Sequence, residues 1–428
     1  TQRRHLESLL STTRAIGSVF DLDELLNKIM DYAITVTGAE RGFLLLYDDK
    51  AGQLSLKLSH GFNALESFSF ESSKLSLELI HEAEKQKDTL IASSDQAPTP
   101  KIQNELKSYN VKQALSAYLT SRDKPIGILY LDNQLSSGTF GKQELELMQS
   151  FAVQASVSLE NAHLVSDLLD QARLRQELEL GREIQMDLLP KVTPTIAGLK
   201  VTGIMLPAKE IGGDYYDFLM NPSLEQLSIV IGDVSGKGVA AGLLMAMVKT
   251  CLYALNKQPI SPREILLATN QMLYEHINAK KFMTMLYLTW SARERRLSYS
   301  SAGHEHILIY RNNLGIERVV PQGTSPNVEA ILSGGFMLGM VPEIDQFLED
   351  RQLTLNPGDK AILYTDGVTE ARDINEELFG LKRLTDIISK EGHKQTRDLL
   401  DAIRQEVYSF IGAREQYDDI TLVVMEAT

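Results

Sequence analysis

The spacing of apolar residues divides the chain into a first region of mixed helices and strands, a long helix and a second mixed region. Between Asp21 and Val36, apolar residues recur every three or four positions, which predicts an amphipathic helix with Asp21 as its cap. Short apolar and β-branched runs between turn residues then predict strands. The strands expected in this region are residues 42–47, 54–59, 114–120 and 126–131, with helices at residues 6–16 and near 75–86.

The middle of the chain predicts one long helix. Residues 142–189 contain no proline and a single late glycine, Gly181. At about 1.5 Å per residue such a helix would be roughly 70 Å long. One apolar seam is made of Val157, Leu164, Leu168 and Leu178, and it is interrupted by Asn161, Gln171 and Arg175. The seam fits either a parallel homodimer or a weak coiled coil, and we expect the dimer.

Beyond Pro190, which ends the long helix, the pattern predicts a second mixed region. The expected strands are residues 200–205, 227–231, 284–290, 296–301, 307–310, 351–355, 360–364 and 420–425, and the expected helices are 239–255, 262–277, 381–389 and 396–411. This order of elements favours an α+β fold built as a layered sandwich.

Length and composition narrow the class of protein. The 428 residues suggest about three structural units. A net charge of -14 argues against nucleic acid or an anionic membrane as the main partner. The single cysteine, Cys251, excludes a disulfide within the chain and a cysteine zinc cluster, and it suits a reducing compartment. The longest apolar run, residues 239–248, is too short to cross a bilayer, and no secretory signal follows Thr1. We therefore expect a cytoplasmic protein.

Aspartates stand at the ends of four strand-like runs in the second region. Asp233 follows the run 227–231 within Ile-Gly-Asp-Val-Ser-Gly-Lys-Gly, and Asp214, Asp366 and Asp418 have comparable places. A single Asp beside glycines most often makes a turn. Four such carboxylates can instead converge on hard divalent cations, which prefer oxygen ligands. The glycines do not form a Walker-type phosphate loop, because only three residues separate Gly232 from the Gly-Lys pair, so nucleotide hydrolysis is disfavoured.

Six motifs occur in order between residues 195 and 428. They are Gly-Gly-Asp-Tyr-Tyr-Asp, Gly-Asp-Val-Ser-Gly-Lys-Gly, Ser-Ala-Gly-His, Gly-Gly-Phe-Met-Leu-Gly, Thr-Asp-Gly-Val-Thr-Glu and Asp-Asp-Ile-Thr. Together they resemble the bacterial PPM-type serine/threonine phosphatases of the SpoIIE and RsbU kind, whose fold is an αββα sandwich with metals at one end. Residues 182–190 resemble the helix that leads into that domain. The chain has Lys237 where the family often has His, and Ser301 where it often has Asn; neither position is a usual metal ligand.

The resemblance implies a two-metal phosphatase that uses Mn²⁺ or Mg²⁺. Asp233 would bridge both ions, Asp366 and Asp418 would complete one, and Asp214 with the backbone carbonyl of Val234 would help to hold the other. Two ions about 3.5–4 Å apart can activate a shared water for in-line attack on phosphorus. No protein nucleophile is then required. The implied substrate is a phosphoserine on a regulatory protein, such as an anti-sigma-factor antagonist.

Several roles stay open at this point. Asp217 and Asp419 either support the metal ligands or are solvated turn carboxylates. His304 could donate a proton, but a structural hydrogen bond is favoured. A non-catalytic sensor and scaffold with a decayed phosphatase-like domain is the alternative function, and a missing metal Asp would mark it; none is missing. A phosphodiesterase or nuclease is disfavoured, because the sequence shows no basic nucleic-acid groove.

The first region resembles a GAF sensory domain. The resemblance rests on residues 39–47 (Ala-Glu-Arg-Gly-Phe-Leu-Leu-Leu-Tyr), 127–132 (Gly-Ile-Leu-Tyr-Leu-Asp) and 151–155 (Phe-Ala-Val-Gln-Ala). No ligand motif can be matched, and His60, His81 and Cys251 are taken as ordinary residues. The expected division is an N-terminal helix at 1–17, a GAF domain at 18–160, a helical linker at 161–190 and a phosphatase domain at 191–428. We expect a signal at the GAF domain to set phosphatase activity through the linker.

Overall fold

The computed structural model describes residues 21–48, 52–61, 75–134, 140–276, 281–312 and 327–428. The helix expected at residues 6–16 lies outside these ranges. The chain divides into two compact units, Thr1–Leu174 and Arg175–Thr428.

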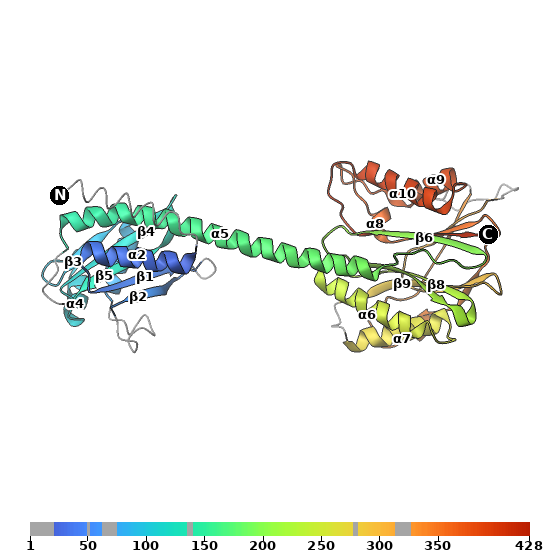
Figure 1. Ribbon diagram of the computed structural model, residues 1–428, viewed down its shortest axis with the longest axis horizontal. Helices are drawn as coiled ribbons and strands as arrows, with labels where there is room; N and C mark the ends of the chain where they lie inside the picture. The colour runs from blue at the N-terminus through green and yellow to red at the C-terminus, as the bar shows by residue number, and fades with distance from the viewer. Residues whose placement is uncertain (1–20, 49–51, 62–74, 135–139, 277–280, 313–326) are drawn as a thin grey trace. The chain divides into compact units, whose positions relative to one another are not determined.

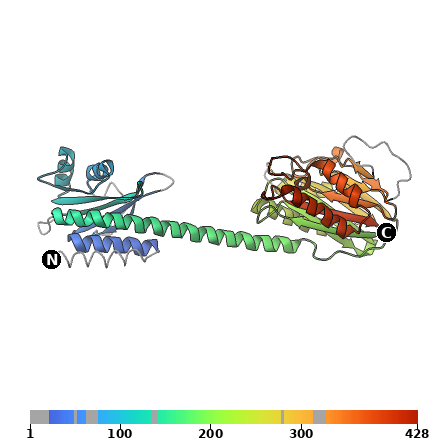
Figure 2. The same cartoon turned by 90° about the horizontal axis from the view of Figure 1, so that it is seen from above.

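Unit 1 contains one antiparallel sheet with helices on both faces (Figures 1 and 2). Its elements are α2 (Leu22–Thr37), β1 (Arg41–Tyr47), β2 (Leu54–His60), α3 (Leu77–Gln86), β3 (Leu90–Ser93), α4 (Pro100–Ser108), β4 (Gln113–Ser121), β5 (Lys124–Asn133) and the first part of α5 (Lys142–Leu188). The strand order is β2-β1-β5-β4-β3. Helices α2 and α5 pack on one face and α3 and α4 on the other.

Alternation of side chains along the strands produces this two-faced sheet. In β1, Leu44 packs toward α2 and α5, whereas Phe43 and Leu45 pack toward α3 and α4. Helix α2 begins where predicted, because the Asp21 side chain accepts a hydrogen bond from the Glu24 amide at 2.9 Å. The four expected strands are confirmed, but β3 and α4 were not predicted. Helix α4 nevertheless has an ordinary start, with Thr99 as its cap and Pro100 in its first turn.

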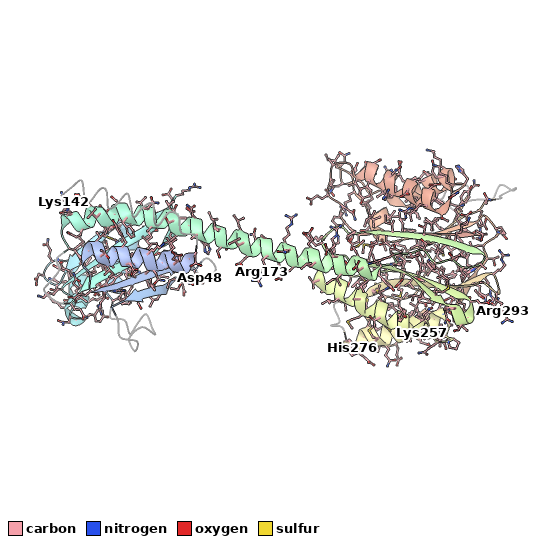
Figure 3. All side chains as sticks on the ribbon, viewed as in Figure 1. Asp48, Lys142, Arg173, Lys257, His276 and Arg293 are labelled. Carbon is pink, nitrogen blue, oxygen red and sulfur yellow. The ribbon has the colours of Figure 1, made fainter. Side chains whose placement is uncertain are left out.

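The predicted long helix is confirmed as α5, which is continuous from Lys142 to Leu188. Its first part buries Phe151, Ala155 and Leu159 in the core of unit 1. From Ser166 to Glu177 every side chain is exposed, and Figure 3 labels Lys142 and Arg173 along this helix. The seam residues Leu164 and Leu168 are 53% and 63% exposed. Among the described residues, no helix combines the length and the apolar character that crossing a membrane requires.

Unit 2 is an αββα sandwich of two five-stranded sheets (Figure 1). The first sheet has the order β13-β10-β9-β8-β7 and the second β12-β11-β14-β15-β6. Its strands are β6 (Leu199–Leu206), β7 (Asp214–Asn221), β8 (Gln226–Val234), β9 (Met283–Ser291), β10 (Arg296–Ala302), β11 (Ile307–Tyr310), β12 (Val328–Ile331), β13 (Arg351–Leu353), β14 (Lys360–Tyr364) and β15 (Ile420–Ala427). Its helices after α5 are α6 (Val239–Leu255), α7 (Pro262–His276), α8 (Asp366–Thr369), α9 (Gly380–Glu391) and α10 (Thr396–Ile411), with short 3-10 turns at Pro222–Leu224 and Asp345–Phe347.

The sandwich of unit 2 also follows from the alternation of side chains along each strand. In β14 and β15, Leu363 and Val423 face the other sheet, whereas Ile362 and Val424 face α9 and α10. Helices α6 and α7 cover the outer face of the first sheet, as Figure 1 shows. The core between the sheets holds the strands rigidly, so the residues at their ends are fixed relative to one another.

Two expectations for unit 2 were wrong in detail. Strand β8 does not stop at Ile231 but continues to Val234, because β7 and β9 pair with it on both sides. Strands β7 and β12 were not predicted as strands. Asp233 therefore lies within β8, opposite Asp214 of β7 on one side and Thr284 of β9 on the other.

Candidate active site

The four predicted aspartates meet at one end of the sandwich, two from each sheet. Asp214 begins β7 and is the cross-strand partner of Asp233 in β8. Asp366 begins α8 just after β14, and Asp418 lies two residues before β15. Because β14 pairs with β15, and β7 with β8, the fold brings these segments together from positions up to about two hundred residues apart.

Burial and mutual repulsion raise the pKa values of three of these aspartates. Burial, followed by the charges of Asp366 and Asp418, raises the pKa of Asp233 to about 7. Burial and the charge of Asp418 raise the pKa of Asp366 to about 6. Burial and the charge of Asp233 raise the pKa of Asp214 well above its ordinary range. Clustered carboxylates with raised pKa values are typical of a site that accommodates positive charge.

Asp214 is held by two buried threonines. Its Oδ2 accepts hydrogen bonds from Thr365 Oγ1 at 2.8 Å and Thr421 Oγ1 at 2.5 Å. The Thr421 amide donates to Thr365 Oγ1 at 3.0 Å, which links β15 to the segment before Asp366. Neither threonine was predicted as a site residue, although each lies within a motif that carries a candidate ligand.

Oxygen atoms converge beside Gly213. A Cβ on this glycine would lie 2.6 Å from the Val234 carbonyl oxygen, 3.0 Å from the Gly236 carbonyl oxygen and 3.2 Å from Asp233 Oδ1. Only glycine fits between these three oxygens, which we call the Gly213 cradle. Carbonyl and carboxylate oxygens are the donors that hard cations prefer. The Val234 carbonyl oxygen and Asp233 Oδ1 therefore both face Gly213.

Asp217 and Asp419 are both buried, so neither is a solvated turn carboxylate. Asp419 accepts backbone hydrogen bonds from Ala208 at 2.7 Å and from Gly213 at 2.6 Å, and thereby fixes the loop before Asp214. Asp217 forms an ion pair with Lys249 of α6 and accepts a hydrogen bond from Tyr215 Oη at 2.9 Å. Asp419 supports the site, whereas Asp217 ties β7 to α6.

Two cations flank Tyr417 next to Asp418. Lys237 Nζ lies 3.1 Å from Asp418 Oδ2 and 4.7 Å from the centre of the Tyr417 ring, and it donates a hydrogen bond to the Tyr417 carbonyl. The Arg372 guanidinium lies 5.1 Å from the same ring. Lys237 therefore contacts a candidate ligand directly, a contact that the sequence analysis did not anticipate.

The residues present fit divalent cations of the hard, oxygen-binding kind. In the described part of the chain, no group of three or more His, Cys, Asp or Glu side chains is arranged to hold a metal ion by itself. The donor set instead combines carboxylates with the backbone oxygens of Val234 and Gly236. Mg²⁺ commonly binds through one or two carboxylates and keeps several waters, so such a set is sufficient.

His304 is buried beside this site. Its Nδ1 lies 3.0 Å from Thr284 Oγ1, and Thr284 is the cross-strand partner of Asp233. Burial lowers the pKa of His304 to about 4, so the ring is neutral near pH 7. This environment favours the structural hydrogen bond over proton donation.

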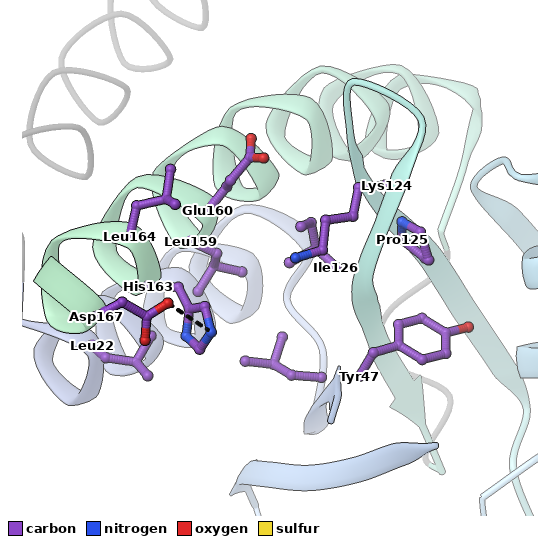
Figure 4. Close-up of a pocket in the computed structure, with 11 residues that line it drawn as sticks. Leu22, Tyr47, Lys124, Pro125, Ile126, Leu159, Glu160, His163, Leu164 and Asp167 are labelled. Atoms are coloured by element: carbon purple, nitrogen blue, oxygen red, sulfur yellow. Dashed lines mark ion pairs between the residues drawn. The ribbon is translucent and has the colours of Figure 1, made fainter. Parts of the chain in front are cut away.

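Unit 1 contains a cavity that the sequence did not reveal. It has a volume of about 150 Å³ and lies where α2, β1, β5 and α5 meet (Figure 4). Apolar residues of these elements line it, together with Tyr47, Lys124, Glu160, His163 and Asp167. His163 Nε2 lies 3.8 Å from Asp167 Oδ2, one helical turn later on α5. Because the polar lining comes from β1, β5 and α5, which are far apart in the sequence, no local motif marks the cavity.

Comparison with known proteins gives two family matches. Residues 224–428 match the family of stage II sporulation protein E (SpoIIE), and residues 21–159 match the GAF domain. Among curated relatives, phosphoserine phosphatase RsbU of Bacillus subtilis (strain 168) is 29% identical over 258 residues, which cover 60% of this chain and 71% of RsbU. Protein IcfG of Synechocystis sp. (strain ATCC 27184 / PCC 6803 / Kazusa) is 30% identical over 279 residues.

The alignment with IcfG covers 59% of this chain and 41% of IcfG, so the chain spans less than half of that relative. Among solved structures, the SiaA-PP2C domain of Pseudomonas aeruginosa aligns with a TM-score of 0.49 and 19% identity, covering 60% of this chain and 99% of that domain. With its two family matches, its six motifs and its sandwich fold, the chain combines a GAF domain, residues 21–159, with a SpoIIE-family domain of the PPM type of serine/threonine phosphatase, residues 224–428.

Proposed function

We propose that unit 2 hydrolyses the phosphoserine monoester of a regulatory protein, with a pair of Mn²⁺ or Mg²⁺ ions at the aspartate cluster. The observation that supports this most is the position of Asp233, which is buried, faces Asp366 and Asp418, and shares the Gly213 cradle with the Val234 carbonyl. A carboxylate between two groups of oxygen donors can serve both groups at once. Such a position supports Asp233 as the bridging ligand.

The residues would divide the work as follows. Asp233 would be shared between two cation positions; Asp366 and Asp418 would complete one, and Asp214 with the Val234 carbonyl would help to form the other. Ions bound at these residues would supply an activated water for attack on phosphorus. Lys237 supplies positive charge next to Asp418, and Arg372 lies against the adjoining Tyr417 ring, so cations are present where an incoming phosphate dianion approaches the aspartates.

An anti-sigma-factor antagonist is the substrate that we propose. RsbU, with which this chain aligns over 258 residues, is named a phosphoserine phosphatase, and this supports phosphoserine as the target. The alternative, a sensor and scaffold with a decayed phosphatase domain, is disfavoured because all four aspartates are present and brought together. A cytoplasmic location is consistent with the single cysteine.

We propose further that the GAF domain controls the phosphatase through a dimeric α5. The helix is continuous from the core of unit 1 into unit 2, and its seam residues Leu164 and Leu168 are more than half exposed. A long apolar seam facing water is typical of a surface that is covered by a partner. The cavity beside His163 adjoins the same helix, so a signal bound there could bias the arrangement of α5.

The direct test is hydrolysis of para-nitrophenyl phosphate and of a phosphoserine peptide by the full chain with Mn²⁺. We expect turnover that chelation abolishes and that fresh Mn²⁺ restores. The Asp366→Asn variant is the matched negative control, and bis-para-nitrophenyl phosphate tests the phosphodiesterase alternative. Turnover that persists in the chelator, or that is equal in the variant, would contradict the proposal.

A further inference from the structure

The loop before Asp214, residues 211–213, is held by backbone hydrogen bonds from several elements. The Ile211 carbonyl accepts from Gly238 at the start of α6, at 3.1 Å. The Gly213 amide donates to Asp419 Oδ2 at 2.6 Å, and the Gly213 carbonyl accepts from Val234 at 3.3 Å. Gly212, between them, has another partner.

That partner is Gln185, near the end of α5. Its Nε2 donates to the Gly212 carbonyl at 2.8 Å, and its Oε1 accepts from the Gly212 amide at 3.0 Å. One side-chain amide thus pairs with both backbone groups of one residue. Gln185 is only 4% exposed although its neighbour Ile184 is 66% exposed, so the helix turns a polar side chain inward at this position. A buried amide is costly unless it is hydrogen-bonded, and here both ends are satisfied.

Three glycines allow this close packing. A Cβ on Gly212 would lie 2.4 Å from Asp419 Oδ2, and one on Gly242 of α6 would lie 2.5 Å from Ile211 Cγ2. A Cβ on Gly181, one turn before Gln185, would lie 2.9 Å from Ile211 Cδ1. Glycine within a helix costs about 1 kcal/mol relative to alanine. At Gly181 that cost is explained by contact with the loop.

We infer that Gln185 is a positioning residue, which transmits the position of α5 to the cation site through Gly212. This inference rests on the proposed function and identifies the contact through which α5 would regulate it. Asp214 and the Gly213 cradle lie within two residues of Gly212, so a displacement of the helix end moves both. Loss of the Gln185 contacts should therefore weaken cation binding rather than substrate binding.

The test compares the full chain with the variant Gln185→Met, which keeps the side-chain volume and removes both hydrogen bonds. The matched control is Gln176→Met, an exposed position on the same helix. Titration calorimetry with Mn²⁺ alone should give binding about tenfold weaker for Q185M and unchanged for Q176M. Hydrogen exchange should be about tenfold faster at the Gly212 amide in Q185M. At saturating Mn²⁺, the KM for para-nitrophenyl phosphate should not change.

A second variant keeps the inference testable if Q185M unfolds. Gly181→Ala adds a Cβ against Ile211 and displaces the same loop while leaving Gln185 intact; we expect Mn²⁺ binding to weaken about threefold. Wild-type Mn²⁺ affinity in both variants, or a raised KM at unchanged metal affinity, would overturn the role of Gln185. Failure of the wild-type chain to bind Mn²⁺ would instead refute the proposed function, so the two failures are distinguishable.

Discussion

Replacing Asp233 by Asn should have opposite effects on stability and on activity. The substitution keeps the shape of the side chain and removes its negative charge. In the chelated protein this charge is opposed by burial and by the carboxylates of Asp366 and Asp418, so its removal should stabilise the fold. In the presence of Mn²⁺, the same change removes the proposed bridging ligand.

The magnitude follows from the pKa of Asp233, which rises from 3.8 to about 7. At 1.36 kcal/mol for each of about three pH units, ionised Asp233 opposes folding by at most about 4 kcal/mol. Part of this cost is burial, which an Asn amide also experiences, so we expect D233N to stabilise the chelated protein by about 1–2 kcal/mol at pH 8. Because the folded-state pKa is the higher one, wild-type stability is fullest below about pH 4 and falls as pH rises toward 7. The advantage of the variant should therefore shrink as the pH is lowered from 8 toward 4.

Urea unfolding of both proteins in chelator at pH 8 and pH 5 measures the first effect, and Mn²⁺-dependent turnover measures the second. We expect turnover to fall by more than about 100-fold, beyond the loss typical of a group that only supports a ligand. A chelated variant less stable than the wild type at pH 8 would refute the electrostatic reasoning. Normal turnover would refute the assignment of Asp233 as a bridging ligand.

Three further predictions concern Lys237, His304 and the exposed part of α5. Lys237→Met removes the cation 3.1 Å from Asp418 Oδ2, which repels an ion bound by that carboxylate, so calorimetry should show Mn²⁺ binding about threefold tighter. Weaker binding would mean that Lys237 holds the Asp418 carboxylate in place instead. His304→Gln should leave the pH–rate profile unchanged between pH 6 and 9, because burial holds the pKa of His304 at about 4, and the loss of one limb of the profile would instead show a role in proton transfer. The same variant should lose about 1–2 kcal/mol of stability, because the contact of His304 with Thr284 is lost. Light scattering should find a homodimer, and a strict monomer at tens of micromolar would contradict the regulatory proposal. A proline introduced near Leu168 should abolish the response of turnover to a signal at unit 1, and a full response in that variant would also contradict the proposal.

Much of the fold could be predicted because its elements have strong local patterns. The bounds of α6, β11 and α10 agree with the sequence-based expectation, since each is a strongly apolar run or a strongly amphipathic helix. Strand β7 and the end of β8 could not be read in this way, because pairing between distant strands extends them through Gly and Asp residues. Gly and Asp are depleted in strands, so tertiary pairing decides the structure at these positions.

The same distinction applies to the candidate site. The aspartates could be named because short motifs carry them, but the supporting contacts join segments far apart in the sequence. Thr421 and Asp214 are separated by 207 residues, and Gly213 and Asp419 by 206. Gln185 lies in residues 182–190, which resemble the helix that leads into the phosphatase domain, but the resemblance gives this residue no role. A second local signal is Gly181 four residues earlier, whose contact with Ile211 only the folded chain reveals.

The most direct measurement of the central claim is the stoichiometry of Mn²⁺ binding to the chelator-stripped full chain by titration calorimetry. With Asp233, Asp366, Asp418 and Asp214 assembled as proposed, we predict two ions per chain and the loss of both in D233N. A wild-type chain that binds no Mn²⁺, or a variant that still binds two ions with unchanged affinity, would contradict the two-metal site.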